Sequence, residues 1–226
     1  MRMALMAIAV VVATGLVACG GDEQTAPLTM EQRILRASDL PGSKPDPVEV
    51  RLTADNLDEF AGWDAQEAEI PRDKLAKAGF VSAIHDTRFL PKEPGGAHTR
   101  DAPHVRVIVL RFRSEDGAAT GAKLVYAKGL EPCPGQCLVQ NEEFEVDGVP
   151  GATGYRRYLT AERAKQAKAT GGPDEPFDSY TIGFTDGPFA YAVDGFAPPS
   201  KISKKQIQEI AQTVYDRVKG APPAGK

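Results

Sequence analysis

The sequence is poor in cysteine, histidine and tryptophan. It has three cysteines, three histidines and one tryptophan among 226 residues. It also lacks an excess of positive charge, because it contains 27 Lys and Arg residues and 31 Asp and Glu residues. That balance argues against a nucleic-acid-binding domain, which would carry a basic surface. Hydrophobic residues make up 42% of the chain, so disorder throughout is excluded as well.

Recognisable catalytic motifs are missing too. No serine stands in a G-x-S-x-G motif, and H-E-x-x-H is absent. The segment 117–123 resembles a phosphate-binding loop only faintly, and we interpret it as a helix with small residues on one face. His85 beside Asp86 is interpreted as an edge or partly buried residue of a strand, with a catalytic base as the alternative. His98 and His104 are interpreted as loop residues in solvent. We predict no catalytic residue, no cofactor and no metal site.

The first eighteen residues have the layout of a signal peptide. Arg2 gives the start a positive charge, and Ala4 to Ala18 contains no charged residue. The uncharged stretch is near the lower length limit for a helix that crosses roughly 30 Å of hydrocarbon. A membrane-spanning anchor is therefore the alternative, but Asp22 and Glu23 follow instead of a positive flank.

Leu16-Val17-Ala18-Cys19 resembles the lipobox of bacterial lipoproteins. The resemblance implies cleavage before Cys19, a diacylglycerol thioether on its sulfur, and acylation of the new amine by a chain such as palmitate. Two or three acyl chains anchor a protein firmly, since each buried CH₂ contributes roughly 0.8 kcal/mol. We therefore predict a protein anchored by lipid at the extracytoplasmic face of the cell membrane. The alternative is a soluble secreted protein with Cys19 at its cleavage site.

Two cysteines remain, in Cys133-Pro-Gly-Gln-Cys137. An exported domain is oxidised, so a disulfide between them is expected. Pro-Gly suits the centre of a type II turn, which would bring the two thiols together. A redox or metal-binding role is the less favoured alternative, because redox motifs have two intervening residues and no further metal ligand is close in sequence.

Hydrophobic periodicity predicts a single α+β domain over residues 48–219. Val105–Arg113 is the clearest strand, and it is apolar on both faces through Leu110, which indicates helices on both sides of the sheet. Short turns, such as the one at Asp186-Gly187, favour antiparallel pairing. The expected fold is a mainly antiparallel sheet covered by helices at 115–128 and after Ser203. The flanking segments are predicted to be a lipid anchor, tether and short helix over 19–47 and a disordered tail over 220–226.

Five arginines, at positions 106, 111, 113, 156 and 157, fall on predicted strands or at strand ends. Arginine favours bidentate contacts with phosphate and carboxylate, so Arg111, Arg113, Arg156 and Arg157 are candidates for a shallow anion-binding surface. Its ligand would be a phospholipid head group or an acidic envelope polymer. Ordinary surface charge paired with nearby glutamates is the simpler alternative.

The aromatic side chains have two interpretations. Six of them, Phe60, Trp63, Phe80, Phe89, Phe189 and Tyr191, could line a pocket, but aromatic residues dominate burial in most cores. We therefore interpret them as core residues, with a ligand pocket as the alternative.

The lipobox, the acidic start after it, the segment 38–42 and the later order of strand and Ala-rich helix resemble cell-envelope lipoproteins of actinobacteria. Related α+β envelope domains are the extracellular sensor of the PknH kinase and the Mog1/PsbP-like lipoproteins. The resemblance implies a binding or accessory module whose partner is a lipid, a small ligand or an envelope protein. A cell-envelope hydrolase with an unrecognised active site is the alternative.

Overall fold

The computed structural model describes residues 26–45, 50–53, 72–90, 103–130, 138–169 and 175–224. The predicted signal peptide and all three cysteines, Cys19, Cys133 and Cys137, lie outside these ranges. The lipid anchor and the disulfide therefore stay predictions.

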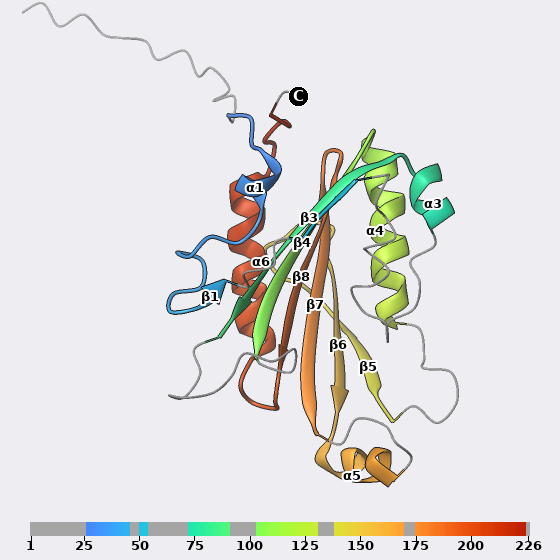
Figure 1. The fold of residues 1–226 in the computed structure, drawn as a ribbon, viewed down its shortest axis with the longest axis vertical. Helices are drawn as coiled ribbons and strands as arrows, with labels where there is room; N and C mark the ends of the chain where they lie inside the picture. The colour runs from blue at the N-terminus through green and yellow to red at the C-terminus, as the bar shows by residue number, and fades with distance from the viewer. Residues whose placement is uncertain are drawn as a thin grey trace, which may run out of the picture.

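The described residues form one antiparallel sheet (Figure 1). Seven strands follow the order β1-β3-β4-β8-β7-β6-β5, and β2 is an eighth that also pairs with β3. All seven strand pairings along this sheet are antiparallel, which confirms the predicted fold class. The strands are β1 (Lys44–Pro45), β2 (Val50–Thr53), β3 (Phe80–Phe89), β4 (His104–Phe112), β5 (Gln140–Phe144), β6 (Thr153–Leu159), β7 (Phe177–Asp186) and β8 (Phe189–Ala197).

Helices cover the sheet on both faces, as Figure 1 shows. The α6 helix packs with α1 on one face, and α4 packs with α3 on the other, while α5 lies at one end of the sheet. Across the described ranges, no helix combines the length and the apolar character needed to cross a membrane. The helices are α1 (Met30–Arg33), α3 (Arg72–Lys77), α4 (Glu115–Leu130), α5 (Ala161–Ala169) and α6 (Lys204–Val218).

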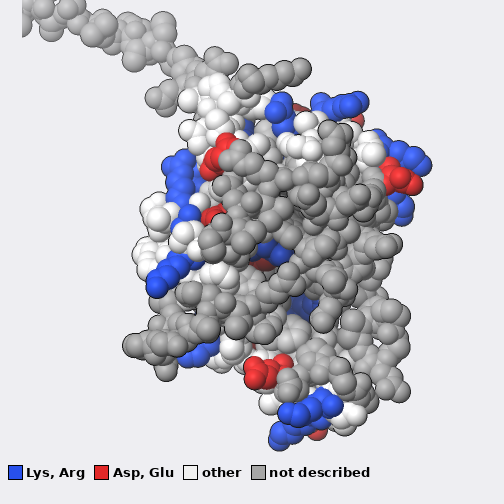
Figure 2. Space-filling model, in the orientation of Figure 1, with Lys and Arg blue, Asp and Glu red and all other residues white. Residues whose placement is uncertain are grey.

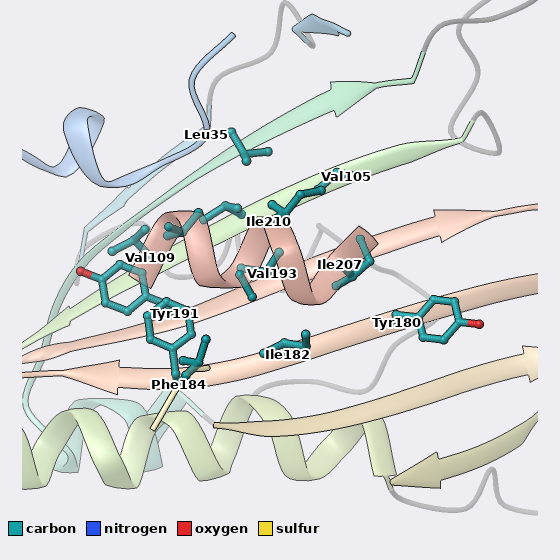
Figure 3. Packing of buried hydrophobic residues seen from close by; sticks show 14 of the residues in the cluster. Leu35, Val105, Val109, Tyr180, Ile182, Phe184, Tyr191, Val193, Ile207 and Ile210 are labelled. Carbon is teal, nitrogen blue, oxygen red and sulfur yellow. The ribbon is translucent and has the colours of Figure 1, made fainter. Parts of the chain in front are cut away.

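Strand β4 contributes to two hydrophobic layers, one on each face of the sheet. Val105, Val107 and Val109 belong to the cluster that packs under α6, where Figure 3 shows Val109 beside Tyr191 and Val193. Ile108 and Leu110 alternate with them and join the cluster under α4. Because successive side chains of a strand point to opposite faces, an apolar run of this kind needs cover on both sides. The predicted central position of this strand is confirmed.

Helix α4 lies close to the sheet because the residues on its inner face are small. Ala118 and Ala122 are buried against the sheet. A Cβ at Gly121 would overlap the ring of Phe112, and one at Gly117 would overlap the carbonyl oxygen of Ala78 in the turn after α3. Packing therefore explains these two glycines, in agreement with the interpretation of 117–123 as a small-faced helix.

Capping interactions define where α6 starts, as the sequence predicts. The backbone N–H of Ser203 donates to Gln206 Oε1 at 2.9 Å, and the N–H of Gln206 donates to Ser203 Oγ at 3.3 Å. At α1 the N–H of Thr29 donates to Gln32 Oε1 at 2.8 Å. The α1 helix ends at Arg33, and the chain continues in an extended conformation from Ile34.

The two ends of the described chain are ordered parts of the domain, which corrects the predicted boundaries. The N–H of Leu28 donates to the Pro222 carbonyl at 3.0 Å, and the N–H of Ala224 donates to the Leu28 carbonyl at 3.1 Å. Ala221 is buried. The predicted disordered tail is therefore wrong as far as Ala224, and residues 26–45 are more than a tether. We call residues 26–45 the N-terminal arm and residues 219–224 the C-terminal tail.

A buried arginine on the arm holds these two segments together. The Arg33 side chain is 0% exposed. Its Nη1 donates to the Tyr191 hydroxyl at 2.9 Å, and its Nη2 donates to the carbonyls of Ala221 and Pro222 at 2.7 and 2.9 Å. The guanidinium also lies 3.8 Å from the centre of the Phe189 ring. A buried charge is tolerated only with such partners, so burial of Arg33 requires arm, tail and sheet to be assembled together.

Two further arginines attach the arm to the rest of the domain. Arg217 of α6 donates to the Ile34 carbonyl at 2.7 Å and pairs with the Asp39 carboxylate at 2.5 Å. Arg88 of β3 donates to the Leu35 carbonyl at 3.3 Å. The arm is thus fixed to the sheet and to α6 over much of its length.

Candidate functional site

The pair suggested as a catalytic base, His85 and Asp86, does not form a site. His85 is 6% exposed and lies on the α4 side of the sheet. Burial, and then the positive charge of Arg106, lowers the pKa of His85 to about 3. Asp86 is the next residue on the strand, so it faces the other side, where it pairs with Arg88 at 2.8 Å. His85 is therefore a neutral core residue at ordinary pH, and the hypothesis of a His85–Asp86 hydrolase loses its candidate base.

The four candidate anion-binding arginines are not brought together. Arg111 and Arg156 lie six register positions apart along the strands, roughly 20 Å. Arg156 pairs with Asp178 at 2.5 Å and lies 4.2 Å from the centre of the Tyr158 ring. Arg157 follows it on β6 and faces the opposite side of the sheet. Of the four, only Arg157 belongs to the surface described next.

A row of aromatic side chains crosses the α4 side of the sheet where β3 and β8 end and β4 begins. His104 stacks on Phe196 with ring centres 5.6 Å apart, and Phe177 stacks on the other side of Phe196 at 5.3 Å. Phe89 completes the row with its edge toward His104 at 6.1 Å. All four side chains are half-buried. We call these residues the aromatic row.

Polar side chains lie beside the aromatic row on the same face. Arg106 Nη2 pairs with Asp194 Oδ2 at 2.9 Å, and its Nε donates to the same oxygen at 3.1 Å. Strand register continues the line of Phe196 through Ser179 of β7 to Arg157 of β6. We call Arg106, Asp194, Ser179 and Arg157 the polar flank, and the row and flank together the strand-end surface.

Strand register creates this surface from positions far apart in the sequence. Phe89 is opposite His104, His104 is opposite Phe196, and Phe196 is opposite Ser179. Side chains that are opposite in an antiparallel sheet share a face and lie within contact distance. Closer to α4, the same face becomes apolar, with Ile108 and Ala192 in its core.

The chemistry of the strand-end surface suits binding better than catalysis. Stacked rings offer an apolar contact, and the guanidinium groups and hydroxyl of the polar flank offer directional hydrogen bonds. Within the described ranges, no three His, Cys, Asp or Glu side chains lie close enough to hold a metal ion. A ligand with an apolar part and a polar or anionic part fits such a surface.

The strand-end surface was not predicted from the sequence. Phe89 was interpreted as a core residue and His104 as a loop residue, although His104 is the first residue of β4. Phe177 and Phe196 carried no signal beyond their aromatic character. The one available indication is an aromatic residue at or next to one end of each of these four strands, and it becomes informative only when the strand order is known.

The described residues also form a groove between α3 and α4. Its volume is about 460 Å³. Two lysines, Lys74 and Lys77, lie on its α3 side, and Ser114, Asp116 and Thr120 lie on its α4 side. The groove is shallow and open, and it lies at the opposite end of the strands from the aromatic row.

This fold resembles a known extracellular domain. It is similar to the crystal structure of the extracellular domain of PknH from Mycobacterium tuberculosis, with a TM-score of 0.50 and 12% sequence identity. The similarity covers 84% of this chain and 97% of that chain. No protein-family model and no curated protein sequence matches the chain. At 12% identity the similarity establishes the fold alone, so the PknH-like part of the resemblance seen in the sequence is confirmed only for the fold.

Proposed function

We propose that this protein is an extracytoplasmic binding module, held at the cell membrane by acyl chains on Cys19, with its ligand site at the strand-end surface. The strand-end surface is the observation that carries the binding role. It combines half-buried aromatic rings with two arginines on one face of a sheet whose centre is covered by helices.

Two further observations support the location. The first nineteen residues contain the charged Arg2, an apolar stretch and the lipobox-like Leu16–Cys19. The chain also has the fold of a domain that is extracellular in PknH. Both agree with a folded body outside the cytoplasm.

The ligand is expected to be amphiphilic. The aromatic row would contact its apolar portion, and Arg157 with Arg106 would meet an anionic or hydrogen-bonding group. Arg106 is already paired with Asp194, so the ion pair contributes a dipole and fixed donors rather than an isolated charge.

Metabolic labelling with a clickable fatty acid tests the anchor. The native protein should incorporate the label and stay with the membrane fraction, and Cys19→Ala should lose both properties. Equal labelling of the two proteins, or native protein that washes off membranes, would refute the lipid anchor.

Hydrogen–deuterium exchange tests the binding site. The acylated protein is compared with and without separated envelope fractions of glycan, phospholipid and protein. A ligand at the strand-end surface should slow exchange in the ends of β3 and β8 and the start of β4, and Phe196→Ala should remove this effect. Arg113→Ala, at the other end of β4, is the control that should keep it. Slower exchange confined to other regions, or none with any fraction, would contradict the proposed site.

A further inference from the structure

One end of the domain holds the start of the N-terminal arm around Leu28, the C-terminal tail and the groove between α3 and α4. The N–H of Gly220 donates to Asp186 Oδ1 at 3.1 Å, beside the turn between β7 and β8. The carbonyl of Pro188 in that turn accepts from the N–H of Phe112 at 2.8 Å, where β4 ends before α4. Figure 1 shows α1, the C-terminus, α3 and the start of α4 at this upper end. We call it the arm end.

The length of chain before the arm limits how far this end can be from the membrane. Ala26 is the first described residue, and it is seven positions after Cys19. A fully extended chain of that length spans roughly 25 Å at most. Because Arg33, Arg88 and Arg217 fix the arm to the domain, the arm does not add to this reach. If Cys19 is acylated, the arm end is the part of the domain nearest the lipid.

The α3–α4 groove brings cationic side chains to the same end. Lys74 and Lys77 are exposed on its α3 side. Arg113, which follows β4, is exposed next to Gly79 at the end of α3. Figure 2 shows Lys and Arg side chains along the upper rim of the domain in the same orientation. Asp116 also lines the groove, so the attraction for anions is moderate.

We infer that the arm end faces the membrane and that Lys74 and Lys77 contact the head groups of anionic phospholipids. The inference rests on the proposed lipid anchor. Lysines close to an anionic bilayer contribute on the order of 1 kcal/mol each, which is enough to orient a domain that is already tethered. In this orientation the strand-end surface lies roughly 25 Å farther from the bilayer, at the other end of β4. Its ligand would then come from the envelope rather than from the bilayer.

Lysine footprinting on vesicles tests this orientation. The acylated protein, purified from membranes, is incorporated into vesicles of neutral lipid or of neutral lipid with about 30% phosphatidylglycerol, which supplies the anionic surface. An amine-acetylating reagent is applied, and the labelling rate of each lysine is measured by mass spectrometry. Lys165 of α5 and Lys201 before α6 are matched exposed controls at the opposite end of the sheet.

We expect Lys74 and Lys77 to be labelled about threefold or more slowly on the anionic vesicles, while Lys165 and Lys201 are unchanged. Salt at roughly 1 M should remove the difference, because the Debye length falls to about 3 Å. Equal labelling of the groove lysines on both vesicle types, or equal protection of the control lysines, would overturn the inference while leaving the anchor intact. Protein that fails to float with either vesicle type would overturn the anchor itself, and the orientation with it.

Discussion

Removal of the Arg33 guanidinium should weaken the whole domain, although Arg33 lies in a segment predicted from the sequence to be peripheral. The test variant is Arg33→Met, which keeps most of the length and apolar character of the side chain. It removes the donors to the Tyr191 hydroxyl and to the carbonyls of Ala221 and Pro222. It also removes the cation from the face of the Phe189 ring.

The expected magnitude follows from what the variant leaves behind. A buried hydroxyl or carbonyl without a partner costs about 1–3 kcal/mol, and two such groups remain, on Tyr191 and Ala221. The lost cation–π contact contributes about 1–2 kcal/mol more. Relief from burying a charge offsets part of this loss. We therefore expect Arg33→Met to lower the free energy of unfolding by about 3 kcal/mol, a large share of the 5–15 kcal/mol that is usual for a domain.

Urea denaturation followed by circular dichroism measures this loss, and Arg36→Met is the matched control. Arg36 is exposed on the same arm, and its backbone N–H, which the substitution keeps, donates to Asp39. The control should change the free energy of unfolding by less than about 0.5 kcal/mol, as is usual for a surface substitution. Deletion of residues 221–226 should cost much less in the Arg33→Met protein than in the native one, because both changes remove the same contacts.

Two results would refute the role assigned to Arg33. One is a loss below about 1 kcal/mol, which would mean that the hydrogen bonds contribute no more than an average surface contact. The other is full additivity of Arg33→Met with the tail deletion, which would show that arm and tail are stabilised independently.

Three further predictions address the core and the cysteines. The folded protein disfavours protonation of His85, because the pKa of this residue is about 3 in the folded state and 6.5 in the unfolded state. The stability that the neutral His85 contributes is therefore complete above pH 6.5 and is lost as the pH falls toward 3. Urea titrations measure the difference in the free energy of unfolding between the native protein and His85→Gln. This difference should fall by about 1.4 kcal/mol when the pH is lowered from 7.5 to 5.5. A difference that stays constant would contradict the buried neutral state of His85. Gly121→Ala should lower the free energy of unfolding by about 2 kcal/mol, because the new methyl group overlaps the ring of Phe112, although alanine has the better helix propensity. A higher melting temperature of this variant would show that α4 shifts without cost. Non-reducing peptide mapping should find Cys133 bonded to Cys137, and free thiols at both would refute the disulfide.

The sequence by itself determined much of the local structure. The Ser203 cap, the strand from Phe80 to Phe89, the turn at Asp186-Gly187 and the two-sided character of β4 were all predicted and are present. These features depend on contacts within a few residues or on a periodicity of two or 3.6 residues, and such information is complete in a short stretch of sequence. The fold class followed from them, because short turns between strands favour antiparallel pairing.

Only the tertiary structure decided which residues share a surface. Arg33 meets Tyr191 and Ala221 across 158 and 188 positions of sequence, and no local pattern distinguishes it from the exposed Arg36 nearby. Phe89, His104, Phe177 and Phe196 form one row because strand order and register align them. The same register separates Arg111 from Arg156, although the sequence suggested one arginine surface. Local propensities set each element, whereas sites arise from the pairing of elements, and that pairing depends on the packing free energy of the whole domain.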